Sequence, residues 1–374
     1  MLTKPSYIFT IFNALSDPRQ QAKVEHRLDE MIFMALCGAV CGIDTWTDLE
    51  EFVRVKIEWF RKYLTLENGV PSHDTFGRVF ALLDTEEFHE CLQRWVESLA
   101  VCLRDQGVHI DGKTLRRSFD TASDTKALTM VSAWASEESL CLGQVAVDAD
   151  SNEITAVPEL LKLLQISGAI VTLDAMHCQK ETARAIRKKD ADYILTVKGN
   201  QPELKQSIEG LFERHAEDGF RDSRVRMHKT RDKGHGREEF RAYTVAPAPA
   251  ALRKQGWVDA RTVGMVYRSR TVKGKETSEV VYFISSLPPQ VRRIAKHLRN
   301  HWTVENQLHW SLDVTFSEDA SRIRKGAAPE LAANFRRIAL SMIKRNTTRK
   351  ASLRAKRLIA GWDETFLAEI LSLK

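Results

Sequence analysis

Residues 168–175, GAIVTLDA, are the segment that most restricts the fold of this chain. They are apolar almost throughout and end in Asp174. A strand of this kind, buried on both faces, is typical of the centre of a parallel sheet that helices cover on either side. We therefore expect an α/β fold in which Asp174 lies at the carboxyl end of a central strand.

The flanking sequence supplies further strands and crossover helices. Before the central strand we expect a short strand, GVHIDG, that ends in Asp111, and a hairpin made of residues 128–136 and 140–148. Helices are predicted for residues 155–166 and 179–190, and a further strand for residues 192–200. The resulting order, βββαβαβ, resembles that of the RNase H-like fold.

We expect four regions along the chain. Residues 1–105 read as an N-terminal helical domain. In it we expect a buried helix in LDEMIFMALCGAV, an amphipathic helix over residues 46–64, and a further helix capped by Ser72. Residues 106–200 read as the first part of the catalytic core. Residues 201–285 contain a helix and Arg/Lys-rich strand-like pieces, which predict a β-rich insertion. Residues 286–374 return to helix as the second part of the core, with basic C-terminal helices.

Three carboxylates form the candidate site. In a βββαβ order the first and fourth strands are neighbours, so Asp111 and Asp174 should lie close together. Two adjacent carboxylates repel each other unless a cation lies between them, and Mg²⁺ prefers such oxygen ligands. Glu305 lies on a predicted helix whose apolar stripe is Val304, Leu308 and Leu312, which places it at the edge of the core.

Each carboxylate also has a structural interpretation. Asp111 precedes a glycine and is compatible with a turn. Asp174 is compatible with a helix cap, and Glu305 with an ion pair to Arg299 or to a neighbouring histidine.

Several motifs resemble the H-repeat-associated family of bacterial insertion-sequence DDE transposases. They include HIDGKTLRRS, SNEITAVPELL, GAIVTLDAMHCQKE, LTVKGNQ, DKGHGREE and the stretch HWTVENQLHWSLDVTFSEDASRIRKGAAPE. The N-terminal SHDTFGRVFALLD is similar to the helical domain associated with that family. The resemblance implies that Asp111, Asp174 and Glu305 are the catalytic, metal-binding D, D and E residues, holding two Mg²⁺ ions for which Mn²⁺ can substitute.

The resemblance further implies a function. A DDE transposase cuts element-end DNA and joins it to target DNA by two-metal phosphoryl transfer. The alternatives are a metal-dependent DNA nuclease on the same fold and a catalytically decayed DNA-binding protein. The implied partner is double-stranded DNA, bound by a homodimer or a larger assembly, in the bacterial cytoplasm and at the nucleoid.

Basic residues are the candidate DNA contacts, in a chain of net charge +6. Those nearest the predicted carboxylates or in the recognised motifs are Lys113, Arg116, Arg117, Lys198, Lys233, His235, Arg237, Arg299, His301, Arg322, Arg324 and Lys325. The C-terminal region is also basic and predicts non-specific phosphate binding through Arg336, Arg337, Lys344, Arg345, Arg349, Lys350, Arg354, Lys356 and Arg357.

Cysteine usage and hydropathy favour a reduced, cytoplasmic protein. The six cysteines are scattered and form no CxxC pair, so neither a zinc site nor a disulfide framework is indicated. The longest N-terminal apolar run, Tyr7 to Phe12, is too short for a signal peptide or a membrane span.

Overall fold

The computed structural model describes residues 7–99, 101–119, 126–147, 151–234 and 236–373. The chain divides into two compact units, each assembled from separate segments. Unit 1 contains Met1–Val101, Gly112–Asn152 and Glu305–Lys374, and unit 2 contains Cys102–Asp111 and Glu153–Val304. These bounds differ from the four regions expected from the sequence, which remain a prediction.

Unit 2 is built on a mixed sheet whose strand order is β1-β4-β5-β9-β8-β7-β6. Its strands are β1 (Gly107–Thr114), β4 (Ile170–Leu173), β5 (Asp192–Val197), β6 (Arg226–Gly234), β7 (Arg237–Pro247), β8 (Thr262–Val272) and β9 (Lys275–Ser285). Strand β4 is buried at all four residues and runs parallel to both neighbours, β1 and β5. The prediction of a central parallel strand before Asp174 is therefore confirmed.

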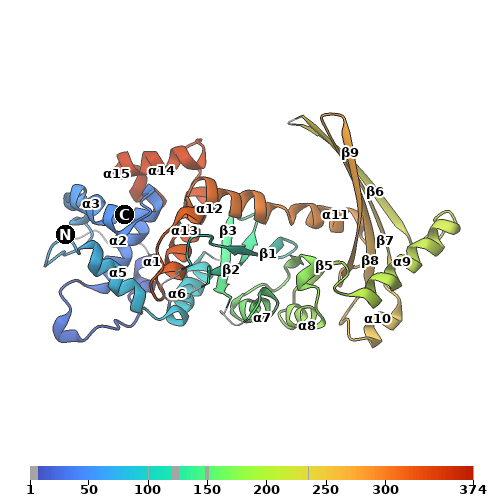
Figure 1. Ribbon diagram of the computed structural model, residues 1–374, viewed down its shortest axis with the longest axis horizontal. Coiled ribbons are helices and arrows are strands. Elements are labelled where there is room, and N and C mark those ends of the chain that lie inside the picture. The colour runs from blue at the N-terminus through green and yellow to red at the C-terminus, as the bar shows by residue number, and fades with distance from the viewer. Residues whose placement is uncertain (1–6, 100, 120–125, 148–150, 235, 374) are drawn as a thin grey trace. The chain divides into compact units, whose positions relative to one another are not determined.

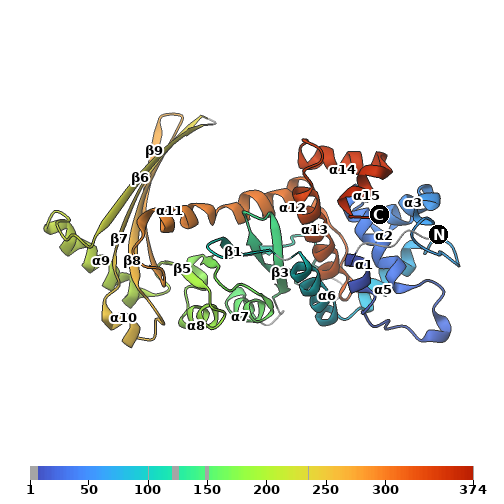
Figure 2. The same cartoon turned by 180° about the vertical axis from the view of Figure 1, so that it is seen from behind.

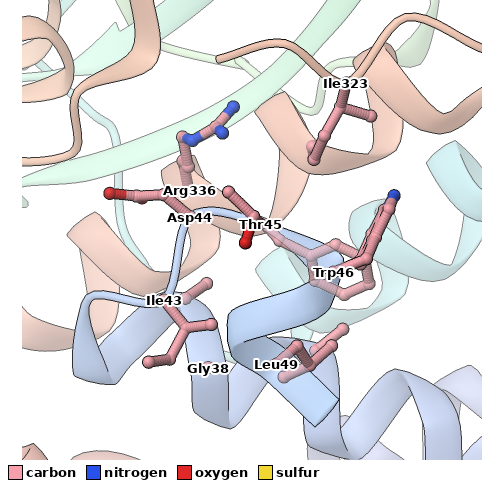
Figure 3. A pocket seen from close by; sticks show the side chains of 12 residues that line it. Gly38, Ile43, Asp44, Thr45, Trp46, Leu49, Ile323 and Arg336 are labelled. Atoms are coloured by element: carbon pink, nitrogen blue, oxygen red, sulfur yellow. The ribbon is translucent and has the colours of Figure 1, made fainter. Parts of the chain in front are cut away.

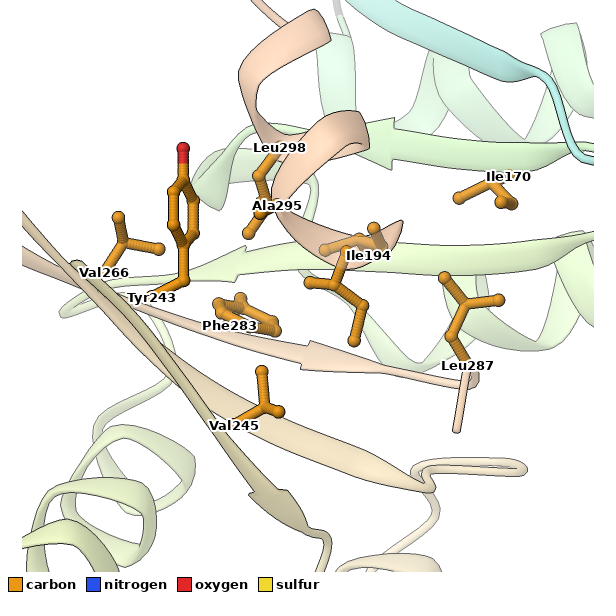
Figure 4. Close-up of a cluster of buried hydrophobic side chains, with 10 residues drawn as sticks. Ile170, Ile194, Tyr243, Val245, Val266, Phe283, Leu287, Ala295 and Leu298 are labelled. Atoms are coloured by element: carbon orange, nitrogen blue, oxygen red, sulfur yellow. The ribbon is translucent and has the colours of Figure 1, made fainter. Parts of the chain in front are cut away.

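The strands of the expected insertion extend the same sheet. Strand β9 pairs antiparallel with β5, Ile194 lying opposite Ser285, and β8, β7 and β6 follow as antiparallel neighbours. Figure 4 shows the core that they share, in which Phe283 and Val245 of the added strands lie near Ile194 of β5. The β-rich segment thus builds its apolar core together with the parallel strands.

Helices cover the sheet of unit 2 on two sides. They are α7 (Glu153–Leu163), α8 (Lys180–Lys188), α9 (Pro202–Glu217), α10 (Ala250–Lys254) and α11 (Val291–Asn300). Helices α7 and α8 lie on one side of β5 and α11 on the other (Figures 1 and 2). Helix α11 buries Ile294, Ala295 and Leu298 in the shared core.

Unit 1 is mainly helical and contains the hairpin of β2 (Thr129–Ala135) and β3 (Leu140–Ala146), which is as predicted. The N-terminal helices are α1 (Tyr7–Phe12), α2 (Leu28–Cys41), α3 (Trp46–Val55), α4 (Ile57–Phe60), α5 (His73–Leu82) and α6 (Thr85–Ser98). The C-terminal helices are α12 (Trp310–Val314), α13 (Ala328–Arg345), α14 (Leu353–Trp362) and α15 (Glu364–Ile370). Helix α2 is almost wholly buried and packs against α13 and α14.

Local signals fix the ends of the N-terminal helices. The Ser72 side chain accepts a hydrogen bond from the Thr75 amide at the start of α5, which confirms the predicted cap. Helix α2 ends at Gly42, whose φ of 92° suits glycine. The amphipathic segment 46–64 was expected as one helix, but it is divided at Lys56, whose backbone leaves the helical region between α3 and α4.

The expectation of a DNA-facing C-terminal region is wrong for four of its nine cations, because their charged groups are used inside unit 1. Arg337 binds Glu318 at 2.6 Å, and both side chains are almost fully buried. Arg357 donates to the Ala39 carbonyl and lies over the Phe316 ring. Residues with less than a tenth of their surface exposed are Arg336, Arg337, Lys356 and Arg357.

Candidate active site

Asp111 and Asp174 occupy matching positions on two parallel neighbours. The register pairs His109 with Thr172 and Ile110 with Leu173, so the next pair of residues is Asp111 and Asp174. The side chains of His109 and Thr172 meet on one face of the sheet, and Asp174 continues the extended backbone. Because side chains alternate along a strand, Asp111 and Asp174 belong to that same face.

The structural interpretations of these two aspartates are not realised. Strand β1 continues through Asp111 to Thr114, so Asp111 lies within a strand and not in a turn; the expectation that the strand ends there is wrong. Asp174 precedes a single 3₁₀ turn, Ala175–His177, and its side chain makes no capping hydrogen bond to that turn. The structure therefore shows neither the predicted turn at Asp111 nor the predicted helix cap at Asp174.

A buried chain of polar side chains leads to Asp174. His109 Nδ1 lies 2.7 Å from the Thr172 hydroxyl, which lies 2.8 Å from His301 Nδ1. His301 Nε2 lies 3.3 Å from Asp174 Oδ1. With a neutral His301, Nε2–H donates to Asp174, Nδ1 accepts from the Thr172 hydroxyl, and Thr172 accepts from His109 Nδ1–H. All these hydrogen-bonding roles are mutually consistent.

Electrostatics keep the two ends of this chain in different charge states. The hydrogen bond from His301 holds the pKa of Asp174 below its usual range, although burial opposes this effect. The positive charge of Lys198 acts in the same direction as His301. Burial holds the pKa of His109 well below its usual range, so its imidazole is neutral at pH 7. Asp174 is therefore a fixed negative charge, linked through His301 and Thr172 to the neutral imidazole of His109.

Asp174 opens into a pocket of about 140 Å³ in unit 2. Its lining also includes the side chains of Thr172, Lys198, His301, Trp302, Arg268 and Glu279. More than half of the Asp174 side chain is exposed, so its carboxylate is accessible to a ligand. The pocket therefore combines the ionised Asp174 with the Lys198 ammonium and with an ion pair in which Arg268 Nη1 lies 3.5 Å from Glu279 Oε1. A carboxylate beside an ammonium that has no ion-pair partner in the described part of the chain suits a metal ion and a phosphate group.

Glu305 lies in unit 1, in a distorted part of the helix that the sequence predicts. Residues Val304–His309 form a π-helical turn, followed by α12. Val304, Leu308 and Leu312 are fully buried, as predicted, whereas Glu305 is exposed. Single π-helical turns interrupt helices rarely and are frequent at functional sites. The π-helical turn is therefore consistent with a functional role for Glu305.

The described residues contain no group of three or more His, Cys, Asp or Glu side chains close enough to hold a metal ion. The oxygen donors nevertheless fit a hard cation in part. Asp111 and Asp174 are neighbours in register, and Oδ2 of Asp174 makes no hydrogen bond or ion pair within the part of the chain that the structure describes. The donor chemistry is that of Mg²⁺ ligands, which are carboxylates completed by water and phosphate oxygens.

The candidate DNA contacts differ in how far their charge is available to a phosphate. Lys113 is a correction: its side chain is 7% exposed, and its ammonium is held by Asp313 at 2.7 Å and Asp319 at 2.8 Å, so it does not face a phosphate. Exposed cations with ion-pair partners are Arg116, Lys233, Arg237 and Arg299. Those that remain exposed or partly exposed are Arg117, Lys198, Arg322, Arg324 and Lys325, while His301 binds Asp174 and His235 lies outside the described residues.

The sequence analysis did not predict three residues of this site. They are the supporting residues His109 and Thr172 and the pocket residue Arg268. The sequence does contain a signal for His109 and Thr172. Each lies two positions before a candidate aspartate, in HID and in TLD. On a buried strand that spacing puts both polar side chains on one face. Arg268 carries no comparable signal, since it reaches the pocket through the pairing of β8 with β9.

Thr172→Val is expected to lower the free energy of unfolding by about 1–3 kcal/mol, because it leaves two mostly buried imidazole nitrogens without their shared partner. Valine keeps the shape and the strand preference of threonine. Urea unfolding of this variant and of Thr172→Ser, which retains the hydroxyl, provides the measurement. A valine variant as stable as the serine variant would show that the hydroxyl does not link the two histidines.

Comparison with known proteins defines the class. The family model described as "Transposase DDE domain" matches residues 103–342, and the model of its associated domain, "DDE_Tnp_1-associated", matches residues 9–96. The "H repeat-associated putative transposase YhhI" of Escherichia coli is 37% identical over 365 residues, covering 96% of each chain. YbfD of Escherichia coli, which has the same description, is 37% identical over 239 residues, covering 64% of this chain and 93% of its own.

The chain therefore belongs to the H-repeat-associated family of DDE transposases. A weak structural likeness is found to a piggyBac transposase synaptic complex with hairpin DNA. It has a TM-score of 0.46 and 12% identity and covers 99% of this chain and 81% of that chain. The part of the chain that the structure describes contains no helix long and apolar enough to cross a membrane.

Proposed function

We propose that this transposase cuts the ends of its own element and joins them to target DNA by metal-dependent phosphoryl transfer. The observation that carries the proposal is the register of β1 and β4, which gives Asp111 and Asp174 matching positions on one face of a parallel pair. Family membership supports the reaction class, and the resemblance of the motif around Glu305 supports the third carboxylate.

Asp111, Asp174 and Glu305 would hold two divalent metal ions. Such ions act as Lewis acids and lower the pKa of bound water, which provides a nucleophile at neutral pH. The remaining chemistry falls to the chain's own side chains. His301 fixes the orientation of the Asp174 carboxylate, and Lys198 offers positive charge to a phosphate in the same pocket.

The exposure of the Asp174 carboxylate favours this function over a structural role. A carboxylate that only stabilises the fold is usually paired with a cation or a backbone amide. Asp174 instead receives one imidazole contact from inside, and over half of its side chain remains exposed. This arrangement positions a charge toward solvent, as a ligand for a metal ion requires.

Two alternatives share the site. A metal-dependent nuclease would use the same carboxylates but would release cut ends without joining them. A decayed DNA-binding protein would have lost them, and the presence of all three carboxylates in the sequence disfavours it. Incubation of the protein with a duplex carrying the element's ends, a target plasmid and Mg²⁺ separates the three functions, because only the transposase forms covalently joined products.

A further inference from the structure

A second, larger hollow lies in unit 1. It measures about 790 Å³ and is lined by α5, by the residues that lead into α3, and by the loop that precedes α13. Four cations line it, Arg78 from α5 and Arg322, Arg324 and Lys325 from the loop. We call this hollow the basic groove. None of its lining residues belongs to the pocket around Asp174.

The loop of the basic groove is attached firmly to α5. Gly326 has a φ of 51°, and a Cβ at that position would lie only 2.2 Å from the Ala81 carbonyl oxygen. The Ala327 amide donates to that same carbonyl at 3.1 Å. Only glycine permits both the backbone conformation and this close approach. The three loop cations are therefore held next to the helix that carries Arg78.

The cations of the basic groove are largely unneutralised. Within the described residues, Arg78, Arg322 and Lys325 form no ion pair with a carboxylate. Arg324 also has no carboxylate partner there, although it donates to the Arg117 carbonyl and lies over the Phe119 ring. Two aspartates, Asp44 and Asp74, line the groove against these four cations, so positive charge dominates. Unpaired cations concentrated in a concave surface attract a polyanion.

The base of the groove adds a further buried charge. Asp44, Thr45, Trp46 and Ile323 also line a small adjoining pocket, shown in Figure 3, together with Arg336. Arg336 is 5% exposed, and its Nη1 has no hydrogen-bond partner in the described part of the chain. Burial lowers the pKa of Arg336, whereas the carboxylates of Glu318 and Asp44 favour its charged form. The negative charge of Asp44 is therefore partly offset by a cation outside the groove lining, which leaves the four lining cations in excess.

We propose that the basic groove binds the phosphate backbone of duplex DNA. The groove is far larger than a single phosphate, and its cations come from two separate segments, so it suits an extended polyanion. Contacts of this kind hold a duplex in place without reading its sequence. The proposal rests on the proposed function, because it takes DNA as the substrate and assigns unit 1 a share in holding it.

The test measures the affinity of the full chain for duplex DNA as a function of salt concentration. The buffer contains no Mg²⁺, so that the duplex is not cleaved during the measurement. The variant combines Arg78→Gln, Arg322→Gln and Lys325→Gln, which removes three charges but leaves the contacts of Arg324 intact. Each lost phosphate contact lowers the log–log salt slope by about 0.9, so the slope should fall by about 2.7. Affinity should fall at least about tenfold at 0.1 M salt, equally for element-end and unrelated duplexes.

A matched control removes three exposed cations outside the groove. Lys188, Lys254 and Arg292 have no ion-pair partner among the described residues, and their combined change to glutamine should leave the slope close to that of the wild type. An equal loss in the control and groove variants would overturn the proposal, since only total charge would then matter.

Three further outcomes are informative. A groove variant that binds like the wild type would overturn the groove proposal while leaving the chemistry at Asp174 intact. A wild-type protein that binds poly-glutamate as tightly as duplex DNA would overturn the assignment of the occupant. A wild-type protein that binds no duplex at all would contradict the proposed function itself and the groove proposal with it.

Discussion

Asp174→Asn is expected to reduce cleavage of element-end DNA by on the order of 10³-fold, because a metal-bound carboxylate contributes several kcal/mol to the transition state. Asparagine keeps the size of the side chain and one oxygen but removes the negative charge. The fold should tolerate the change, because the Asp174 side chain is mostly exposed and has His301 as its one ion-pair or hydrogen-bond partner among the described residues. DNA binding and the thermal unfolding midpoint should therefore remain close to those of the wild type.

Asp190→Asn provides the matched control for this prediction. Asp190 is an exposed aspartate with a φ of 55°, a conformation that asparagine accepts readily, and it does not line the pocket. The control should cleave at the wild-type rate. Full cleavage by both variants would contradict the assignment of Asp174 to the active site. A large loss of folded Asp174→Asn protein would indicate that Asp174 has a structural role.

Arg337→Met is expected to reduce the free energy of unfolding by about 3–5 kcal/mol, because it leaves a buried carboxylate without its main partner. Arg337 Nη1 lies 2.6 Å from Glu318, and its Nε donates to Ser132 of β2 at 3.2 Å. The Lys113 ammonium lies 3.7 Å from the same carboxylate and compensates only in part. Urea unfolding measures the loss.

The control for this prediction is Arg61→Met, which breaks an exposed pair with Glu58. An exposed ion pair contributes about 0–1 kcal/mol, so the control should change stability little. Similar small losses in the two variants would mean that Glu318 finds other partners or that the pair is not buried in solution.

The elements that the sequence predicts well are those with a strong local pattern. Strand β4 and helix α2 are apolar runs of characteristic length, and the Ser72 cap is a short-range signal. The π-helical turn around Glu305 was not predicted, because the apolar spacing of Val304, Leu308 and Leu312 fits a regular helix equally well.

Charged residues were predicted less well because their environment depends on distant partners. Lys113 follows a motif aspartate and was expected to face phosphate, but its acidic partners lie about 200 residues further along the chain. Arg337 was expected in a basic surface, but its partner Glu318 is buried with it. Local sequence shows the charge of such residues but not whether another segment neutralises it.

The candidate site was predicted in outline from the strand order. The neighbouring positions of Asp111 and Asp174 follow from the parallel pairing of β1 and β4, which any βββαβ order of this kind implies. The link from His109 through Thr172 to His301 depends on α11 reaching the sheet from a distant part of the chain. This link was therefore visible only in the structure.

The most direct measurement of the central claim is strand transfer by the wild type and by Glu305→Gln, side by side, on an element-end duplex with a target plasmid. Glutamine is nearly isosteric with glutamate, so packing of the π-helical turn should survive while the charge is lost. The wild type should form joined products in Mg²⁺ and none when the metal is chelated, and Glu305→Gln should bind the duplex normally but neither cut nor join it. Joined products from Glu305→Gln, or joining by the wild type that does not depend on a divalent metal, would contradict metal-dependent transposition by these three carboxylates.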